Sequence, residues 1–338
     1  ATHTRKLWPL LTAGILAALS LSGCQSSLSP DGQTAVTLSE VAHSIFYAPQ
    51  YAAIELGYFE EEGIDLTLVN AGGADKVMTS LISGDAQIGF MGSEASIYVY
   101  QEGSDDPAVN FAQLTQRAGN FLVGRQAEED FKWQDLKGKT VLGGRAGGMP
   151  QMVFEYILKK NGLDPVNDLT IDQSISFGLT AAAFTSSAAD YTIEFEPFAT
   201  TLEMEGSGAV VASLGTESGY VPYTAYSARK SYLKQHPEVI QSFTNAIQKG
   251  LDYVNSHSSE EIAKVISPHF KETPVDKLAL IVERYKSQDT WKENTVFEEN
   301  SFTLLKRILE EAGELKAEVP YNELVTMDFS KKAAKNSQ

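Results

Sequence analysis

Residues Ile64 to Phe90 read IDLTLVNAGGADKVMTSLISGDAQIGF, and this stretch decides the fold that we expect for the chain. The segment from Ile64 to Val69 alternates apolar and polar side chains, as a strand buried on one face does. From Ala74 to Ile82 the apolar residues recur at helical spacing, and Gly84 marks the end of that helix. A short apolar run, Gln87 to Phe90, then predicts a second, buried strand. A strand, a helix and a strand in this order are typical of an α/β fold with parallel strands.

The same alternation recurs on both sides of this stretch. Val36 to Ser39 predicts an earlier strand, and Pro49 can occupy the first position of the helix that follows. The pattern restarts near residue 136, where the strand Thr140 to Leu142 and the helix Pro150 to Asn161 flank a glycine-rich turn. Two such cycles predict two α/β lobes, each a mostly parallel sheet flanked by helices. Further expected strands are Phe111–Thr115, Phe121–Val123, Leu169–Ile171, Tyr191–Phe195, Ala209–Ala212 and Tyr223–Tyr226, and further helices are Ser93–Gln101, Pro237–Asn255, Ser259–Ile266, Pro274–Gln288 and Asn300–Ala312.

The composition restricts what the chain can bind. Of its 338 residues 43% are hydrophobic, which is enough for a buried core, and the length fits about two domains. The formal net charge of −17 argues against a nucleic-acid partner, because a basic surface is needed to neutralise phosphates. A single cysteine excludes an intramolecular disulfide and a cysteine-rich metal site. We expect neither a metal ion nor a cofactor.

The first residues have the pattern of a secretory signal. Arg5 and Lys6 precede an apolar run, Leu7 to Leu21, which ends in Leu-Ser-Gly-Cys24. These four residues resemble a bacterial lipobox, in which the cysteine is lipidated. We interpret residues 1–24 as a lipoprotein signal peptide and residues 25–33 (QSSLSPDGQ) as a flexible tether, which would anchor the protein to the extracytoplasmic face of the cell membrane. A transmembrane helix is the alternative, but the run contains Pro9 and is shorter than the roughly 20 residues that span a bilayer.

Enzymatic motifs are missing from the sequence. There is no Gly-x-Ser-x-Gly, no His-Glu-x-x-His and no Gly-x-x-x-x-Gly-Lys-Ser/Thr. His43 lies in a loop between a strand and a helix, where contact with a ligand or capping of the helix suits it better than catalysis. His236, His257 and His269 lie in polar helical segments, where we expect them to be solvated. The sequence therefore predicts a protein that is not an enzyme.

The loops that follow the strands are the expected binding positions. In open parallel sheets, ligands bind beyond the carboxyl ends of the strands, near helix N-termini. The turn Gly143 to Gly148 follows a strand and opens a helix, so it suits an anionic or polar ligand, although a closely packed turn explains it equally well. For each single residue the alternative is a role in a turn or a cap. The candidate ligand-binding residues are His43, Ser44, Tyr47, Gly72, Gly73, Ser93, Glu94, Arg117, Gly147, Gly148, Met149, Phe177, Tyr191, Glu194, Glu196 and Tyr223.

A family resemblance rests on several of these segments in order. The run Phe46 to Leu66 (FYAPQYAAIELGYFEEEGIDL) resembles the N-terminal signature of bacterial ABC-transporter substrate-binding proteins of the nitrate/sulfonate/taurine and thiamine-precursor (NMT1-like) type. Gly72-Gly73, Leu81–Gly89, Asp135–Val141 and Ala189–Pro197 continue the resemblance, which extends from about residue 36 to residue 312.

The resemblance implies a two-lobed, type II periplasmic-binding-protein fold with a cleft between the lobes. Lobe 1 would comprise residues 34–123 and 227–330, and lobe 2 residues 124–226, followed by a polar tail at 331–338. Hinges near Gly124 and Tyr226 would let the lobes close on a ligand. The implied partners are a small solute and the membrane subunits of an ABC permease, with the protein itself a monomer.

The ligand itself is left open between two classes. Yeast pyrimidine synthases of the same fold use a cysteine-rich motif and a sacrificial histidine, and the missing cysteines exclude that chemistry here. Glu94, Glu194 and Glu196, with aromatic residues beside them, favour an amine-bearing heteroaromatic ligand such as a thiamine-related pyrimidine. A sulfonate such as taurine, or nitrate, is the alternative, with Arg117 and Arg145 as the basic candidates. A surface sensor or adhesin and an extracytoplasmic enzyme on this fold are the competing functions of other classes.

Overall fold

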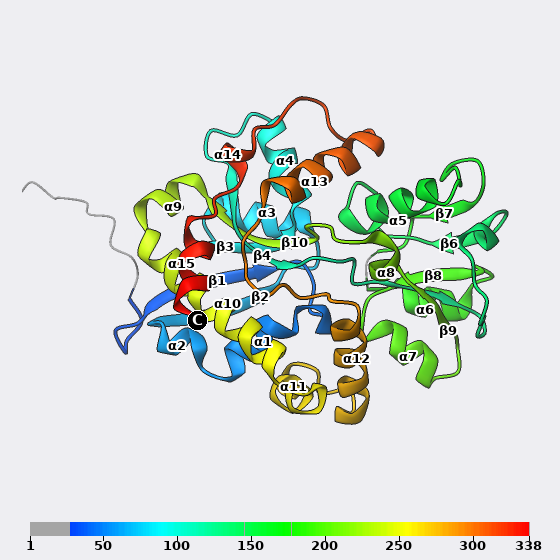
Figure 1. Cartoon of the computed structure of the whole chain (residues 1–338), viewed down its shortest axis with the longest axis horizontal. Coiled ribbons are helices and arrows are strands. Elements are labelled where there is room, and N and C mark those ends of the chain that lie inside the picture. The colour runs from blue at the N-terminus through cyan, green and yellow to red at the C-terminus, as the bar shows by residue number, and fades with distance from the viewer. Residues whose placement is uncertain (1–27, 145, 177, 338) are drawn as a thin grey trace, which may run out of the picture.

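Two five-stranded sheets of the same topology form the framework of the protein (Figure 1). The computed structural model describes residues 28–144, 146–176 and 178–337. The strand order is β2-β1-β3-β10-β4 in the first sheet and β7-β6-β8-β5-β9 in the second. The strands are β1 (Thr34–Glu40), β2 (Ile64–Asn70), β3 (Ile88–Gly92), β4 (Ala108–Thr115), β5 (Phe121–Gly124), β6 (Thr140–Leu142), β7 (Thr170–Asp172), β8 (Tyr191–Glu194), β9 (Ala209–Ser213) and β10 (Thr224–Arg229).

Helices flank both sheets, so the expected two-lobed α/β architecture is confirmed. In each sheet four strands share one direction, and a single strand, β10 or β5, runs antiparallel between two of them. The helices are α1 (Ala48–Glu55), α2 (Tyr58–Glu61), α3 (Ala74–Ser83), α4 (Glu94–Gln101), α5 (Met149–Lys160), α6 (Thr180–Ser186), α7 (Phe198–Met204), α8 (Leu214–Ser218), α9 (Lys230–Gln235), α10 (Pro237–Ser256), α11 (Ser259–Ile266), α12 (Val275–Ser287), α13 (Glu299–Glu311), α14 (Tyr321–Leu324) and α15 (Asp328–Asn336), with 3-10 turns η1 (Ile45–Tyr47), η2 (Trp133–Leu136) and η3 (Ser267–His269).

The chain crosses between the lobes twice. Residues 116–120 connect β4 of the first sheet to β5 of the second, and residues 214–223 connect β9 back to β10. The expected hinges, Gly124 and Tyr226, instead lie within the strands β5 and β10, so the crossings lie a few residues earlier in the chain. Both strands are short and mostly buried, and their own residues do not indicate which sheet they join.

The two ends of the described chain are more regular than we expected. Within the predicted tether, Ser29 N–H donates to the Gln33 carbonyl (2.7 Å), and Leu28 forms a β-bridge with Thr34. The predicted polar tail is largely the helix α15, which packs against α10 and buries Ala333. Cys24 and the predicted signal peptide lie outside the described residues. Among the helices of the described part, none is both long and apolar enough to span a membrane.

One apolar core continues from the first lobe into the second. Phe46, from the loop after β1, is fully buried, and its ring lies 5.5 Å from that of Tyr285 and 5.7 Å from that of Phe195 in the second lobe. Gly119 in the crossing passes directly over this ring, because a Cβ there would lie 2.5 Å from Phe46 atoms. The hinge is therefore packed against aromatic side chains, and it positions the two lobes around the space between them.

Candidate functional site

A cleft of about 930 Å³ lies between the two lobes. Cavities of roughly 300–1,000 Å³ are typical of small-molecule sites. The first lobe contributes the loop after β1 and the starts of α3 and α4, and the second lobe contributes the start of α5 and residues 173–176. Its principal lining residues are Val41, Ala42, Tyr47, Gly72, Gly73, Met78, Thr79, Gly92, Glu94, Tyr98, Gln101, Gly147, Gly148, Met149, Ser174, Ser176, Phe195, Tyr223, Thr224, Glu314 and Lys316.

Glycines allow the backbone to turn into the helices that border the cleft. Gly72 (φ 71°) and Gly73 (φ 158°) precede α3, and Gly147 (φ 77°) precedes α5, all in backbone conformations that other residues rarely adopt. Helix N-termini present free N–H groups and a partial positive charge. The cleft therefore offers hydrogen-bond donors to a polar ligand from both lobes.

Glu94, the first residue of α4, is the buried acid of the cleft. It is 3% exposed, and burial raises the pKa of its carboxyl to about 7, although the backbone N–H groups of Glu94 and Met149 act in the opposite direction. Its Oε2 atom has no hydrogen-bond partner among the described residues, and the same holds for the hydroxyl of Tyr223 beside the cleft. A Cβ at position 92 would lie 2.2 Å from Oε2, so Gly92 provides the space that this carboxyl occupies.

The helix α4 presents further polar side chains to the cleft, one and two turns after Glu94. The Tyr98 hydroxyl donates across the cleft to the carbonyl of Gly147 (2.7 Å). The Gln101 Oε1 atom accepts the backbone N–H of Lys316 (2.7 Å) and of Ala317 (3.0 Å). The C-terminal segment thereby forms a third wall of the cleft, to which Glu314 and Lys316 contribute.

A smaller cavity of about 20 Å³ lies in the second lobe and shares Pro150, Ile175 and Phe195 with the cleft. Its acid is Glu194, which is 3% exposed and accepts hydrogen bonds from Thr180 Oγ1 (2.6 and 2.9 Å) and Thr192 Oγ1 (2.9 Å). Burial raises the pKa of Glu194 to about 7, and these hydroxyls partly offset it. The remaining lining residues are Asn120, Gly143, Gly144, Gly178, Thr180, Ile193 and Phe198.

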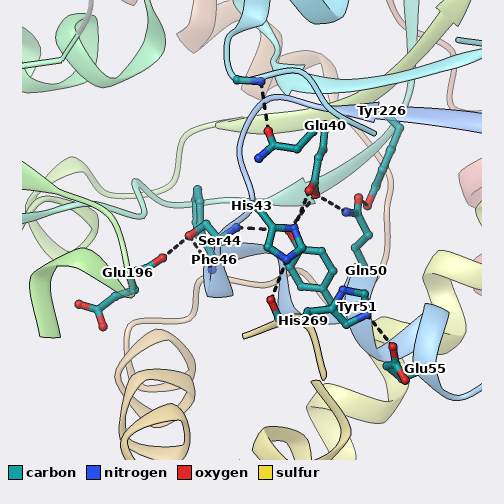
Figure 2. A network of polar contacts seen from close by, with 12 residues as sticks. Glu40, His43, Ser44, Phe46, Gln50, Tyr51, Glu55, Glu196, Tyr226 and His269 are labelled. Atoms are coloured by element: carbon teal, nitrogen blue, oxygen red, sulfur yellow. Dashed lines mark hydrogen bonds and ion pairs between the residues drawn. The ribbon is translucent and has the colours of Figure 1, made fainter. Parts of the chain in front are cut away.

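His43 belongs to a different network, behind the cleft wall (Figure 2). Its Nδ1 lies 2.7 Å from Oε1 of the fully buried Glu40, and its Nε2 lies 2.9 Å from the carbonyl oxygen of His269. Gln50 and Tyr51 donate to the other oxygen of Glu40, at 2.9 and 2.8 Å. Both ring nitrogens of His43 therefore face acceptors, an arrangement that favours the imidazolium form.

The charges around His43 decide its pKa. Burial lowers the pKa of His43, but the hydrogen bond and charge of Glu40 and the His269 carbonyl outweigh burial and raise it above 6.5. His269 stacks on Tyr51 with ring centroids 4.8 Å apart, and its Nε2 lies 2.7 Å from Glu55. Its side chain is 15% exposed, so our expectation that it is solvated was wrong; its partners are more than 200 residues away in the chain.

Half of the predicted ligand residues line the cleft, and most of the others that the structure describes are engaged elsewhere. Those on the cleft are Tyr47, Gly72, Gly73, Glu94, Gly147, Gly148, Met149 and Tyr223, and Glu194 lines the smaller cavity. Ser44 donates to the Glu196 carbonyl (2.6 Å), and Ser93 to that of Pro222. Phe177 lies outside the described residues.

Three charged or aromatic candidates have structural partners. Arg117 donates to the Gly215 carbonyl (3.0 Å) and lies over the ring of Tyr220 (4.3 Å). The Tyr191 hydroxyl donates to Glu128 (2.9 Å). The Glu196 carboxylate accepts from Thr200 and lies 3.6 Å from Arg284 of α12, so it is compensated within the protein. These residues are accordingly not part of the cleft lining.

Sequence reasoning missed several lining residues. Tyr98 and Gln101 follow Glu94 at helical spacing, so the face of α4 could have been read from the sequence once Glu94 was chosen. Asn120 and Phe195 belong to the strand-end segments Gln116–Asn120 and Glu194–Pro197, which the sequence marks as expected binding positions, although neither was chosen as a candidate. Thr180 had no comparable signal, because a separate segment brings it to the cavity. Within the described ranges, no group of three or more His, Cys, Asp or Glu side chains is placed to hold a metal ion.

Comparison with known proteins gives a family and a fold. The model of the family described as NMT1/THI5 like matches residues 45–261. The protein "Putative binding protein YtlA" of Bacillus subtilis (strain 168) is 44% identical over 318 residues, which are 94% of each chain. The yeast (Saccharomyces cerevisiae) 4-amino-5-hydroxymethyl-2-methylpyrimidine phosphate synthase THI5 is 23% identical over 62% of this chain and 63% of its own. The solved alkanesulfonate-binding protein SsuA from Xanthomonas axonopodis pv. citri, bound to MOPS, has a TM-score of 0.69 at 14% identity, covering 87% of this chain and 98% of SsuA.

Proposed function

This chain belongs to the NMT1/THI5-like family, and from that premise we propose that it is the extracytoplasmic solute-binding component of an ABC importer. It captures a small polar molecule between its lobes and delivers it to a permease. The observation that carries the proposal is the cleft of about 930 Å³ between two lobes that are joined by two short crossings. The relative at 44% identity is also named a binding protein.

The cleft favours a heteroaromatic amine such as a thiamine-related pyrimidine as the ligand. Glu94 presents a carboxyl oxygen without a partner among the described residues, which accepts a hydrogen bond from an N–H or O–H group of such a ligand. Tyr47, Phe195 and Tyr223 supply flat apolar surface beside it. The yeast relative at 23% identity is named for an aminopyrimidine.

A sulfonate, taurine or nitrate is the second candidate. Helix N-termini border the cleft and suit an anion, and SsuA, whose fold is similar, is titled an alkanesulfonate-binding protein. Against it stands Glu94, because an ionised carboxylate repels an anion in a poorly hydrated cleft.

Binding without turnover is part of the proposal. The distant yeast relatives are synthases, whereas this chain has a single cysteine, at position 24, and lacks the cysteine-rich motif expected of them. We further propose that Cys24 carries a lipid anchor, because it ends the lipobox-like Leu-Ser-Gly-Cys, and that the protein acts as a monomer. A Cys24→Ser variant that remained in the membrane fraction would contradict the anchor.

A thermal-shift screen tests the ligand class. The panel contains 4-amino-5-hydroxymethyl-2-methylpyrimidine, thiamine, taurine, ethanesulfonate and nitrate. A ligand at 100 times its Kd stabilises the folded protein by about 2.7 kcal/mol, which is measurable as a higher Tm. Mass spectrometry of small molecules released by denaturing the purified protein extends the screen to solutes outside the panel. If no probe shifts the Tm and no small molecule is released, the proposal fails; a changed product after incubation would favour an enzyme.

A further inference from the structure

The small cavity of the second lobe contains an unusual buried amide. Asn120, the last residue of the crossing before β5, is 1% exposed, yet neither its amide nitrogen nor its amide oxygen has a hydrogen-bond partner among the described residues. A buried amide without partners costs roughly 1–3 kcal/mol of folding free energy. An unpaired buried group calls for an explanation, and here the explanation we pursue is a bound ligand that supplies the partners.

The strand register brings Asn120 beside the acid of the same cavity. Phe121, the next residue, pairs with Glu194 across the β5–β8 ladder, and Asn120 and Glu194 both line the cavity. Thr180, which donates to Glu194, is the third polar residue of the lining. Among the described residues, the other walls are glycine or apolar, namely Gly143, Gly144, Pro150, Ile175, Gly178, Ile193, Phe195 and Phe198.

The small cavity shares part of its lining with the cleft. Pro150, Ile175 and Phe195 border both spaces. A volume of about 20 Å³ exceeds the roughly 10–15 Å³ needed for one water molecule, so it admits a single functional group and not a whole ring. The edge of a flat ligand can therefore enter this space while the body of the ring stays in the cleft against Phe195.

We infer that Asn120, Thr180 and Glu194 form the specificity subsite of the cleft, which takes the N–C–NH₂ edge of an amino-substituted heterocycle. An amide presents a donor and an acceptor side by side, and it pairs with a ring nitrogen and its neighbouring amino group as asparagine pairs with adenine. The second N–H of the amino group can then donate to Glu194. A sulfonate or nitrate, which carries acceptors only, leaves the amide oxygen unpaired and faces the carboxylate of Glu194.

The inference rests on the proposed function, because it assumes that the cleft captures a solute. It adds a residue, Asn120, and a reason for its burial. A purely structural asparagine would instead resemble Asn110, which is 2% exposed in the first lobe and donates to Ser96 Oγ (2.9 Å) and the Leu324 carbonyl (3.1 Å). The contrast between these two buried asparagines supplies the matched control.

The test combines calorimetric binding with thermal stability. The probes are 4-amino-5-hydroxymethyl-2-methylpyrimidine and its analogue that lacks the 4-amino group, measured on the wild-type chain, Asn120→Leu and Asn110→Leu. We expect the wild type to bind the amino compound at least about tenfold more tightly than the analogue. Asn120→Leu should remove this preference and raise the Tm of the unliganded protein, since an apolar side chain of similar size replaces an unpaired amide. Asn110→Leu should lower the Tm and keep the preference.

Each outcome decides between the two proposals. If the wild type prefers the amino compound and Asn120→Leu keeps that preference, the subsite is wrong while the solute-binding function stands. If only sulfonates or nitrate bind, the subsite is again wrong and the alternative ligand class holds. If no probe binds and no small molecule is released on denaturation, both proposals fall. Should Asn120→Leu not fold, Asn120→Asp, which keeps the size but replaces the amide donor by an acceptor, must weaken binding of the amino compound at least about tenfold.

Discussion

Buried carboxyl groups are the residues on which binding and stability depend most directly. Burial raises the pKa of Glu94, Glu194 and Glu196 to about 7 in each case. Glu196 lies 3.6 Å from Arg284, and Glu194 has two threonine hydroxyls, whereas Glu94 keeps one oxygen without a partner among the described residues. The acid with the fewest partners is thus the one that lines the main cleft.

Glu94→Gln should stabilise the unliganded protein above pH 7. The folded pKa of Glu94, about 7, lies above its ordinary 4.5, so its contribution to stability is intact below pH 4.5 and is lost as the pH rises to about 7. Glutamine does not titrate, and at pH 8 the variant should be more stable by up to about 3 kcal/mol, at 1.36 kcal/mol for each pKa unit between 4.5 and about 7. Denaturant unfolding at pH 4.5 and pH 8 measures the difference in free energy of unfolding between the variant and the wild type, which should be small at pH 4.5.

The same Glu94→Gln variant should bind 4-amino-5-hydroxymethyl-2-methylpyrimidine less tightly, by about tenfold, because the hydroxymethyl group of the ligand then donates to a neutral acceptor instead of a charged one. Glu129→Gln, an exposed position in the loop after β5 that does not line the cleft, is the control and should change neither quantity. If Glu94→Gln were less stable than the wild type at pH 8, the ionised Glu94 carboxylate would have to be stabilised by its surroundings, and the prediction would be wrong.

His43→Asn should cost stability mainly at acidic pH. The folded pKa of His43 lies above 6.5, so the contribution of its charge is fully present below pH 6.5 and is lost as the pH rises through the folded pKa. The groups that face its ring are Glu40, Tyr51 and His269, with Glu55 behind His269. Asparagine retains a donor without the charge, so the loss should be about 1–2 kcal/mol at pH 5.5.

The difference between wild type and His43→Asn should narrow at pH 9, measured by denaturant unfolding at both pH values. His236→Asn, outside this network, controls for the loss of any histidine. If the stability difference between wild type and His43→Asn were equal at both pH values, His43 would have to be neutral in the folded protein.

Among the secondary-structure elements, α1 and α10 approach each other very closely. Gly250 lies in the middle of α10, and a Cβ there would be 2.3 Å from the carbonyl oxygen of Pro49 in α1. Gly250→Ala gains up to about 1 kcal/mol of helix propensity, but overpacking costs about 1–3 kcal/mol and this contact is backbone, which cannot rotate away. We expect a net loss of stability, measured as a lower midpoint of unfolding. Ser242→Ala on the same helix should be nearly neutral, and a stabilised Gly250→Ala would contradict the close approach.

The sequence predicted the elements better than their assembly. Hydrophobic periodicity and glycine or proline boundaries gave β6 (Thr140–Leu142) and α11 (Ser259–Ile266) with the bounds that the structure has, because these signals are local. The predicted lobe boundaries put Phe121–Val123 in the first lobe and Tyr223–Tyr226 in the second, whereas β5 joins the second sheet and β10 the first. The sequence could not show this, because the strands that pair with β5 and β10 lie far away in the chain.

The candidate site follows the same division. Glycines before helices and the acid at the start of α4 carry local signals, and they line the cleft as expected. His43 is held behind the cleft by the carbonyl of His269, and Asn120 shares its cavity with Glu194; both neighbours are distant in the chain, and no pattern in the sequence joins them. Long-range register, not local propensity, therefore sets which polar residues reach the ligand space.

At the scale of the whole molecule, a few polar contacts join the lobes in addition to the shared core. Ser44 of the first lobe donates to the Glu196 carbonyl of the second (2.6 Å), and Arg284 of α12 lies 3.2 Å from Glu203. Lys159 of α5 donates to the carbonyl of Glu311 at the end of α13 (2.6 Å), where Figure 1 shows α13 above the space between the lobes. A small number of contacts is consistent with closure and opening that differ by only a few kcal/mol.

The hydrogen bond from Tyr98 to Gly147 is one of the contacts that cross the cleft, beside that of the Met149 N–H with Glu94, so Tyr98→Phe should favour the open form. One neutral hydrogen bond contributes about 0.5–1.5 kcal/mol, which corresponds to a roughly two- to tenfold change in the closed-to-open ratio. The ring of Tyr98 remains in the variant, so the packing of α4 is preserved. Since closure retains the ligand, the weaker affinity should appear mainly as faster dissociation of 4-amino-5-hydroxymethyl-2-methylpyrimidine.

Stopped-flow dissociation and small-angle scattering measure both effects of Tyr98→Phe, with a larger radius of gyration expected at subsaturating ligand. Tyr100→Phe is the matched control, because this hydroxyl on the same helix is directed to Glu323 of the first lobe and away from the cleft. Faster dissociation in Tyr98→Phe alone would assign the retention of ligand to the bond across the cleft. Equal rates in both variants and the wild type would instead assign closure to the aromatic core around Phe46, which the substitution leaves intact.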